Sequence, residues 1–358
     1  MFAAFSDDAA QLLTSDGNGF RMFSLPPVTP GFAKVRDCTD MGPVTLLSVL
    51  PDLDIAAIVG PTAGAHGHGR RLRLYDMVKD EELTEMFFEA EILGVRMNVK
   101  RLAIIMEKHT HLFDLATLQP LPQIRTSHPP NTRGLGSLSC LGADTSCYFA
   151  FSQSVDSGTD QRGDVLVLEA IDAATVTVIT AHRAPVVALE FSPRGDALVT
   201  ASRKGNVVRV FAIPDGQPMY AFRRGQAEAL IYSVALSADL SLCAAIGDTG
   251  TLHVFRSADK AAGGTSAFSG EGARSFAKHP VRKQPGQCRF SDDATRLFVL
   301  YSPQRLDAAE PSVSAAPGAP TKVCSITRGV PIAAPGSGCL LQFEVERDKL
   351  RPSGEHQF

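Results

Sequence analysis

A unit of three short apolar strands recurs along the chain, and this repeat restricts the possible folds more than any other feature. In each unit an apolar strand leads through a small polar turn to a second strand, and a Gly-containing turn leads to a third. A period of about 40–45 residues with several short strands per unit is typical of β-propellers. The spacings between successive first turns are 45, 47, 44, 50, 45 and 54 residues, which predicts an all-β, seven-bladed β-propeller. These first turns fall at Ser6, Pro51, Asn98, Gly142, Ser192, Ser237 and Ser291.

One unit shows the pattern most clearly, through residues 187–196, 197–201 and 207–211. The competing fold is a β-sandwich or barrel with evenly spaced strands. A sandwich needs only about half this length, however, and does not repeat three-strand units at near-constant spacing. The chain contains no tryptophan, so Tyr75-Asp76 and Phe113-Asp114 are the nearest counterparts of the Trp-Asp pair of standard WD repeats. The repeats are therefore degenerate and WD40-like.

Three segments break the period within this single predicted domain, 1–358. Residues 60–71 form a glycine-rich loop in the second unit, 256–286 an insertion in the sixth, and 307–321 a Pro/Ala/Ser-rich loop in the seventh. Such excursions lie on the surface and often carry function. The sequence leaves open which terminus completes the last blade, and residues 339–346 are the candidate closing strand.

Two adjacent arginines and a glycine, in Phe222-Arg223-Arg224-Gly225, end a predicted hairpin between the fifth and sixth units. Successive side chains on a strand point to opposite faces, so the two guanidinium groups are expected to serve two sites, one on each side. Arginine is a planar fork of donors that suits phosphate oxygens, and a glycine leaves room for an approaching ligand. The alternative is a solvated basic turn, because arginine pairs are common on surfaces.

With this motif in a tryptophan-poor, seven-bladed propeller, the chain resembles the PROPPIN family, whose animal members are called WIPI proteins. The resemblance is weak over nearly the whole chain and strong over residues 163–255. It implies an effector of phosphatidylinositol 3-phosphate and 3,5-bisphosphate, with two headgroup sites on either side of the arginine pair. The strong stretch contains Ala181-His182, Thr200-Ala201-Ser202-Arg203-Lys204-Gly205, Val208-Arg209-Val210-Phe211, Phe222-Arg223-Arg224-Gly225 and Gly250-Thr251-Leu252-His253-Val254-Phe255.

The resemblance also assigns residues to the two headgroup sites. Guanidinium, hydroxyl and imidazole N–H groups suit phosphate and inositol oxygens, although each of these residues, taken singly, also fits an ordinary strand. The sequence departs from the family at Gly247, where a serine or threonine is usual, so the resemblance implies either a weaker second site or substitution by Thr249. The first site would contain Arg223 with His182, Thr200, Ser202, Gly205 and Arg209. The second would contain Arg224 with Thr251 and His253, and Gly225 of the motif is the remaining headgroup-binding residue.

The insertion 256–286 is the expected membrane-facing loop. It carries six basic residues against two acidic ones, although the protein as a whole has a net charge of −3. Phe268 and Phe276 are expected to enter the headgroup boundary, where each basic residue near an anionic surface adds about 1 kcal/mol. The alternative is a solvated flexible loop, since its glycine-rich composition also fits disorder. The basic residues are Arg256, Lys260, Arg274, Lys278, Arg282 and Lys283.

Other classes of function find little support in the sequence. A net charge of −3 and a pI near 6.3 argue against a protein that coats nucleic acid. No nucleophile elbow, phosphate-binding loop or H-E-x-x-H motif occurs, so we expect neither an enzyme nor a cofactor. The pairs His66/His68 and His109/His111 lack an evident third ligand, and the seven cysteines form no C-x-x-C pair, so no metal site is predicted. The remaining alternative is a propeller scaffold for protein–protein interaction, which would lack salt-sensitive, lipid-specific binding.

Met1 leads directly into a predicted strand rather than a charged leader, and no apolar run reaches 18 residues. We therefore expect a cytoplasmic protein whose contact with a membrane is peripheral. The resemblance implies recruitment to autophagic (phagophore) or endosomal and vacuolar membranes. It implies phosphoinositide-containing membranes and autophagy proteins as partners, such as a rod-shaped lipid-transfer protein, and no nucleic acid.

Overall fold

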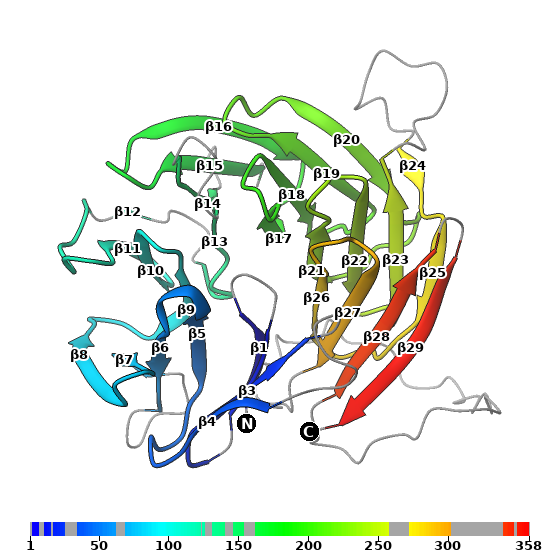
Figure 1. Cartoon of the computed structure of the whole chain (residues 1–358). Helices are drawn as coiled ribbons and strands as arrows, with labels where there is room; N and C mark the ends of the chain where they lie inside the picture. The colour runs from blue at the N-terminus through cyan, green and yellow to red at the C-terminus, as the bar shows by residue number, and fades with distance from the viewer. Residues whose placement is uncertain are drawn as a thin grey trace, which may run out of the picture.

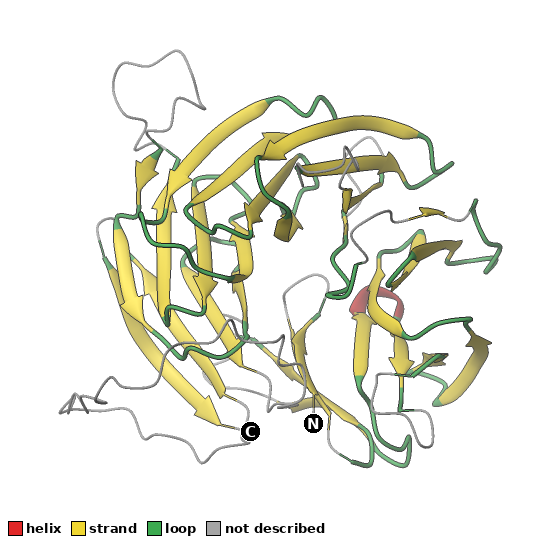
Figure 2. Cartoon of the chain, turned by 180° about the vertical axis from the view of Figure 1, so that it is seen from behind, coloured by secondary structure: helices red, strands yellow, loops and turns green. Residues whose placement is uncertain are grey.

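Seven β-sheets stand around a central opening, as the repeat predicts (Figures 1 and 2). Six sheets have four strands, and one has five. We number the sheets as blades 1–7 in chain order, and the fold is a seven-bladed β-propeller. The computed structural model describes residues 2–6, 11–15, 17–25, 34–61, 69–122, 124–125, 131–139, 146–153, 162–257, 272–301, 339–346 and 349–357.

Within each blade consecutive strands pair antiparallel from the channel outwards. Blade 1 comprises β1(Phe2–Phe5), β2(Gln11–Ser15), β3(Phe20–Ser24) and β4(Lys34–Cys38). Blade 2 comprises β5(Leu46–Leu50), the short 3-10 helix η1(Pro51–Leu53), β6(Ile55–Val59), β7(Arg71–Asp76) and β8(Glu81–Phe87). Blade 3 comprises β9(Ile92–Met97), β10(Arg101–Met106), β11(His109–Asp114) and β12(Ile124–Arg125). Blade 4 comprises β13(Ser137–Leu138), β14(Tyr148–Gln153), β15(Gly163–Glu169) and β16(Thr175–His182).

The remaining three blades follow the same order, with one exception. Blade 5 comprises β17(Val186–Phe191), β18(Ala197–Ser202), β19(Val207–Ala212), β20(Pro218–Arg223) and, as a fifth strand, β24(Ala273–Arg274). Blade 6 comprises β21(Ile231–Leu236), β22(Leu242–Gly247), β23(Thr251–Arg256) and β25(Ala277–Pro280). Blade 7 comprises β26(Gln287–Phe290), β27(Arg296–Tyr301), β28(Cys339–Val345) and β29(Leu350–Gln357). The exception is β24, which returns from blade 6 and pairs parallel with β20.

The small polar residues that mark the repeat cap the first hairpin of their blades. In blades 5, 6 and 7 the Ser192, Ser237 and Ser291 hydroxyls each accept the backbone N–H of the residue five positions on, at 3.1, 2.9 and 3.0 Å. Such local side-chain bonds make serine favourable in turns. In blade 4 the mark predicted at Gly142 lies outside the described residues, and the Ser139 hydroxyl accepts the Tyr148 N–H at 2.8 Å.

Among the described strands, none is exchanged between the first and last blades. Blade 7 uses only residues from 287 onwards, and blade 1 only residues up to 38. The seam between them consists of apolar side chains, including Phe5 and Leu12 of blade 1 with Phe298 and Leu340 of blade 7. Contrary to the prediction, the segment 339–346 is not the outermost strand of the last blade. It forms the third strand, β28, and β29 is the outermost. The loop 307–321 lies outside the described residues.

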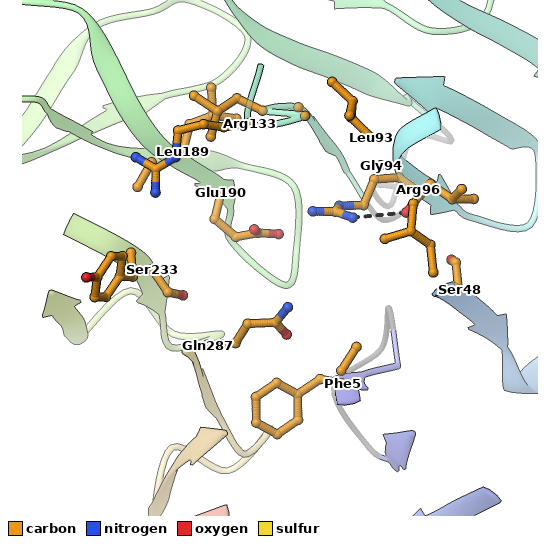
Figure 3. A pocket seen from close by; sticks show the side chains of 18 of the residues that line it. Phe5, Ser48, Leu93, Gly94, Arg96, Arg133, Leu189, Glu190, Ser233 and Gln287 are labelled. Atoms are coloured by element: carbon orange, nitrogen blue, oxygen red, sulfur yellow. Dashed lines mark hydrogen bonds between the residues drawn. The ribbon is translucent and has the colours of Figure 1, made fainter. Parts of the chain in front are cut away.

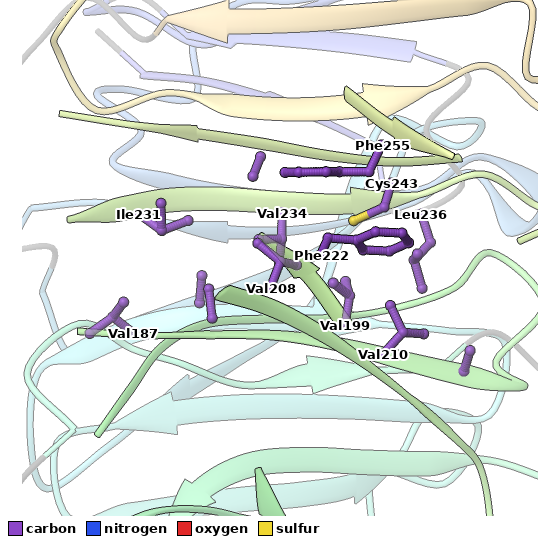
Figure 4. Close-up of a cluster of buried hydrophobic side chains, with 14 residues drawn as sticks. Val187, Val199, Val208, Val210, Phe222, Ile231, Val234, Leu236, Cys243 and Phe255 are labelled. Atoms are coloured by element: carbon purple, nitrogen blue, oxygen red, sulfur yellow. The ribbon is translucent and has the colours of Figure 1, made fainter. Parts of the chain in front are cut away.

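The innermost strands surround a central cavity of about 290 Å³ (Figure 3). Between neighbouring blades the sheets pack through continuous apolar clusters. The cluster between blades 5 and 6 is drawn in Figure 4, where Phe222 stacks on Phe255 with ring centroids 5.1 Å apart. Because Phe222 directly precedes the arginine pair, this packing fixes where the pair lies.

Candidate functional site

The arginine pair lies where the fourth strand of blade 5 ends. β20 ends at Arg223, and the Arg224 N–H donates to Asn206 O at 2.8 Å. Phe222 faces blade 6 through its stack on Phe255, so alternation along the strand places Arg223 on the opposite face. Arg223 therefore lies on the face of blade 5 that is turned away from blade 6, whereas Arg224 follows the end of the strand.

Arg224 is held by the backbone of its own blade. Its side chain is buried, Nε donates to Gly205 O at 2.7 Å, and a terminal nitrogen donates to Ala227 O. Burial lowers the pKa of its guanidinium, and Asp248 of blade 6 acts in the opposite direction. A Cβ on Gly205 would lie 1.8 Å from Ala229 O, and the φ of +62° belongs to the left-handed region, so glycine is required here. This tight turn positions Arg224 at the boundary with blade 6.

Three of the residues expected in the first headgroup site form a polar cluster between blades 4 and 5. His182 Nε2 lies 2.9 Å from Thr200 Oγ1, and the Thr200 hydroxyl donates to Arg209 O at 3.4 Å. Arg209 Nη1 donates to Ala181 O at 2.5 Å. Burial, with a smaller effect of Arg209, lowers the pKa of His182 to about 3, so the imidazole is neutral at pH 7. Ser202, two residues beyond Thr200 on β18, is also buried.

The strand register relates Arg223 to this cluster. Arg209 pairs with Ala221 of β20, and Arg223 is two positions further along the same strand. Residues two apart on a strand share a face, so Arg223 lies on the same face of blade 5 as Arg209. The arrangement agrees with the side of the sheet on which the sequence predicts the first site.

The residues expected in the second site lie on β23, beside Arg224. His253 is buried, and its Nδ1 lies 3.3 Å from Ser275 Oγ. Burial, followed by the charges of Arg224 and Lys278, lowers the pKa of His253 to about 4. Thr251, at the start of the same strand, is half-buried. These residues bring a neutral imidazole, two hydroxyls and two cations to one edge of blade 6.

The backbone leaves no room for a side chain at Gly247, where the resemblance leads to an expected serine or threonine. A Cβ at Gly247 would lie 2.5 Å from Leu230 O. Carbon and oxygen atoms do not approach this closely, so a serine or threonine there requires the backbone of Leu230 to move.

A cavity of about 220 Å³ opens where the two blades meet. The described residues that line it include four basic side chains and no acidic one. β24 brings Arg274 beside Arg223, with which it pairs, and β25 brings Lys278 opposite His253. Both arginines of the motif line this one cavity, whereas alternation alone predicts a separate site for each. The lining residues are Arg223, Arg224, Gly225, Gln226, Arg274, Ser275 and Lys278.

Gly225 borders open space, since a Cβ built there meets no protein atom within 4 Å. The protein itself therefore does not require glycine at this position. Ser275 and Gln226 also line the cavity and were missed from the sequence. Ser275 lacked a signal of its own, and only the neighbouring Arg274 and Lys278 indicated its environment.

The remaining described residues of the insertion 256–286 divide between core and surface. Phe276 packs against the core of blades 6 and 7, and the Arg256 guanidinium lies 4.2 Å from the centre of its ring. Arg282 Nη2 lies 3.4 Å from Glu355 Oε1, whereas the Lys283 side chain is exposed. Phe268 lies outside the described residues, as does Lys260. Of the described loop, Arg274, Lys278 and Lys283 are the exposed basic residues.

Among the described residues, no three or more His, Cys, Asp and Glu side chains form a cluster suited to a metal ion. His109 and His111 both approach Glu89, at 3.8 and 3.2 Å. His66 and His68 lie outside the described residues. In the same described part of the chain no helix is long and apolar enough to cross a membrane.

Comparison with known proteins connects this geometry to a family. Residues 1–277 match the PROPPIN family model. The chain is 33% identical over 257 residues to WD repeat domain phosphoinositide-interacting protein 2 of Xenopus laevis, which covers 72% of this chain and 56% of that protein. It is 29% identical over 272 residues to autophagy-related protein 18 of Aspergillus terreus, covering 71% of this chain and 62% of that protein. The chain thus spans less than two thirds of the length of these relatives.

Two solved structures share the fold over almost the full length. Kluyveromyces lactis Hsv2p superposes with a TM-score of 0.70 at 16% identity, covering 99% of this chain and 97% of that one. KlAtg21, solved in complex with the coiled coil of AgAtg16, gives a TM-score of 0.73 at 19% identity, with 100% and 99% covered. The fold, the arginine motif at the edge of blade 5 and the match over residues 1–277 lead to one conclusion. This chain belongs to the PROPPIN family.

Proposed function

We propose that the cavity between blades 5 and 6 binds the headgroup of phosphatidylinositol 3-phosphate, phosphatidylinositol 3,5-bisphosphate or both. The observation that carries the proposal is the charge of the cavity. Arg223, Arg224, Arg274 and Lys278 line it, and no carboxylate does among the described lining residues. Cations that converge on a concave site raise the local concentration of a polyanion, and guanidinium groups bind phosphate oxygens with paired donors.

The polar cluster on the other face of β20 is the second contact in this proposal. The Thr200 hydroxyl contacts both His182 Nε2 and the Arg209 backbone carbonyl, and the register puts Arg223 on the same face of blade 5 as Arg209. Two headgroup contacts on one rigid edge raise avidity, because the second binding event becomes intramolecular. Lys283 and the other exposed basic residues of the loop add attraction to an anionic membrane surface.

At the level of the cell, this effector would be recruited from the cytoplasm to the surface of autophagic (phagophore), endosomal or vacuolar membranes. The names of the relatives support this assignment, since one is a phosphoinositide-interacting protein and the other an autophagy-related protein. Its role is binding rather than catalysis, and its protein partners would be autophagy proteins such as a rod-shaped lipid-transfer protein. The coiled coil bound to KlAtg21 is a precedent for a protein partner in this fold.

Liposome flotation across a phosphoinositide series tests the proposal. Wild type is expected to float with vesicles containing the 3-phosphate or 3,5-bisphosphate lipids, and not with unphosphorylated phosphatidylinositol. Arg223→Ala combined with Arg274→Ala is expected to reduce the bound fraction at least tenfold, because it removes two of the four cations of the cavity. Binding should also weaken steeply with added salt.

Arg194→Ala is the matched control. Arg194 is exposed in the β17–β18 turn of the same blade, at the opposite end of β18 from Ser202. Its loss changes the net charge without changing the cavity, so flotation should be unaffected. A double variant that still binds like wild type would refute the headgroup assignment. A folded wild type that binds no phosphoinositide would favour the protein-scaffold alternative.

A further inference from the structure

The central cavity is a second concave site, separate from the edge at which lipid binding is proposed (Figure 3). Its charged lining residues, among those that the structure describes, are Arg96, Arg133, Arg289 and Glu190. Three guanidinium groups thus face one carboxylate in a protein whose net charge is −3. Concentration of positive charge at one place in an acidic protein indicates an anion site rather than an average surface.

Three of these residues occupy equivalent places in the repeat. Arg96, Glu190 and Arg289 each lie two residues before the side chain that caps the first hairpin of their blade. Because the blades repeat around the ring, equivalent positions lie at a similar depth in the channel. Arg289 Nη2 is 3.0 Å from Glu190 Oε1, and the Ser137 hydroxyl donates to the same oxygen at 3.2 Å. Arg289 therefore pairs with the carboxylate, and the described lining as a whole has three guanidinium groups to one carboxylate.

Arg96 and Arg133 are presented to the cavity from two different elements. Arg96 is on β9, and Figure 3 shows its guanidinium directed towards the middle of the cavity. Arg133 is carried by a loop that the Asn131 side chain closes through two hydrogen bonds of 2.8 Å to the backbone of Leu135. Burial and, to a smaller extent, Asp248 raise the pKa of Tyr232 in blade 6, and the charge of Arg133 partly opposes this rise. Arg96 is thus held by a β-strand and Arg133 by a hydrogen-bonded loop, which lowers the entropy cost of binding an anion between them.

We propose that the central channel binds a small soluble polyanion with two or more phosphate groups, which Arg96 and Arg133 hold with help from Arg289. The volume of about 290 Å³ is close to the lower end of small-molecule pockets, about 300 Å³. Gln287 and Tyr232, which also line the cavity, supply donors to the remaining oxygens of such a ligand. The site does not depend on the proposed lipid function, since it shares no residue with the cavity between blades 5 and 6.

Isothermal titration calorimetry with inorganic tripolyphosphate tests this proposal. The titration is made in an Arg223→Ala/Arg274→Ala background, which removes two of the four cations of the outer cavity and so reduces its contribution. One tripolyphosphate is expected to bind per chain. Arg133→Gln and Arg96→Gln are each expected to weaken the affinity at least tenfold, and Arg194→Gln to leave it unchanged. Arg133 is exposed in its loop, so Arg133→Gln is expected to melt at the same temperature as its background.

The outcomes separate this proposal from the lipid proposal. Tripolyphosphate binding that is lost when Arg96→Gln and Arg133→Gln are added to this background supports the channel site, provided that the same two substitutions in the otherwise wild-type chain leave flotation with phosphoinositide vesicles unchanged. Equal affinity in the presence and absence of the two channel arginines overturns it. Absence of any tripolyphosphate binding in the Arg223→Ala/Arg274→Ala background also overturns it, whatever the flotation result.

Discussion

Arg223 and Arg224 are neighbours in sequence, but their replacement is expected to have different costs for the fold. Arg224 is 8% exposed and donates to two backbone carbonyls, those of Gly205 and Ala227. Arg223 is half-buried at the end of its strand. Arg224→Ala therefore removes the donors that join two adjacent turns of blade 5, whereas Arg223→Ala mainly removes charge from the cavity.

The magnitude follows from the bonds that are lost. A buried carbonyl left without its donor costs about 1–3 kcal/mol. The Gly205 carbonyl accepts the 2.7 Å bond, and Ala227 is exposed, so water replaces the second donor. We expect Arg224→Ala to lower the free energy of unfolding by about 2 kcal/mol, and Arg223→Ala by about 0.5 kcal/mol or less, as for surface substitutions. With an unfolding entropy of about 2.1 cal/mol/K per residue, 2 kcal/mol corresponds to a melting temperature about 3 °C lower.

Thermal melting followed by circular dichroism measures this difference, with flotation on the same samples. Arg224→Lys is the control that keeps the charge but not the planar fork, and it should lose most of the same stability. Both alanine variants should bind lipid less well, yet only Arg224→Ala should melt earlier. Equal melting temperatures for Arg223→Ala and Arg224→Ala would refute the structural role given to the Arg224 side chain.

Two further predictions follow from the glycines and the histidines. Gly205→Ala should lower the melting temperature and weaken flotation, because its Cβ would meet Ala229 O at 1.8 Å, whereas Gly225→Ala has open space and should leave melting unchanged. Reduced lipid binding by Gly225→Ala at an unchanged melting temperature would show that a ligand approaches there; unchanged binding would contradict it. The folded pKa values of His182 and His253 are about 3 and about 4, below the unfolded value near 6.5. At pH values between the folded and unfolded pKa, the unfolded chain therefore binds more protons than the folded chain. The contribution of these two histidines to the free energy of unfolding should be complete above pH 6.5 and fall as the pH decreases towards 4. His253→Gln should make this decline with pH less steep in urea denaturation series. An unaltered pH dependence would contradict the buried, neutral state of His253.

The hairpins could be predicted because their signals are local. In blades 5 and 6 the turn serine is followed by an acidic residue, which is a recognisable local signal. In the structure the Ser192 hydroxyl donates to Asp196 and the Ser237 hydroxyl to Asp239, each at 2.6 Å. β29 was missed because Pro352 and Gly354 disfavour a strand, and an exposed outermost strand has no apolar pattern to show.

The arginine motif of the site could be predicted from the sequence, but the strands that bring other basic residues to it could not. Alternation placed Arg223 on the face opposite Phe222, a property of the strand itself. It did not show that β24 returns from blade 6 to pair with β20, because that contact joins residues about fifty positions apart and depends on the fold. For the same reason the convergence of Arg274 and Lys278 on the arginine pair required the structure.

The seam between blades 1 and 7 has a consequence for how the ring is made. Since every sheet is built from consecutive strands apart from the added β24, a growing chain completes each blade without waiting for its distant end. Contacts that are close in sequence form early and fast. The contacts of Phe5 and Leu12 with Phe298 and Leu340 join residues from the two ends of the described ring, so we expect ring closure to follow the formation of the individual blades.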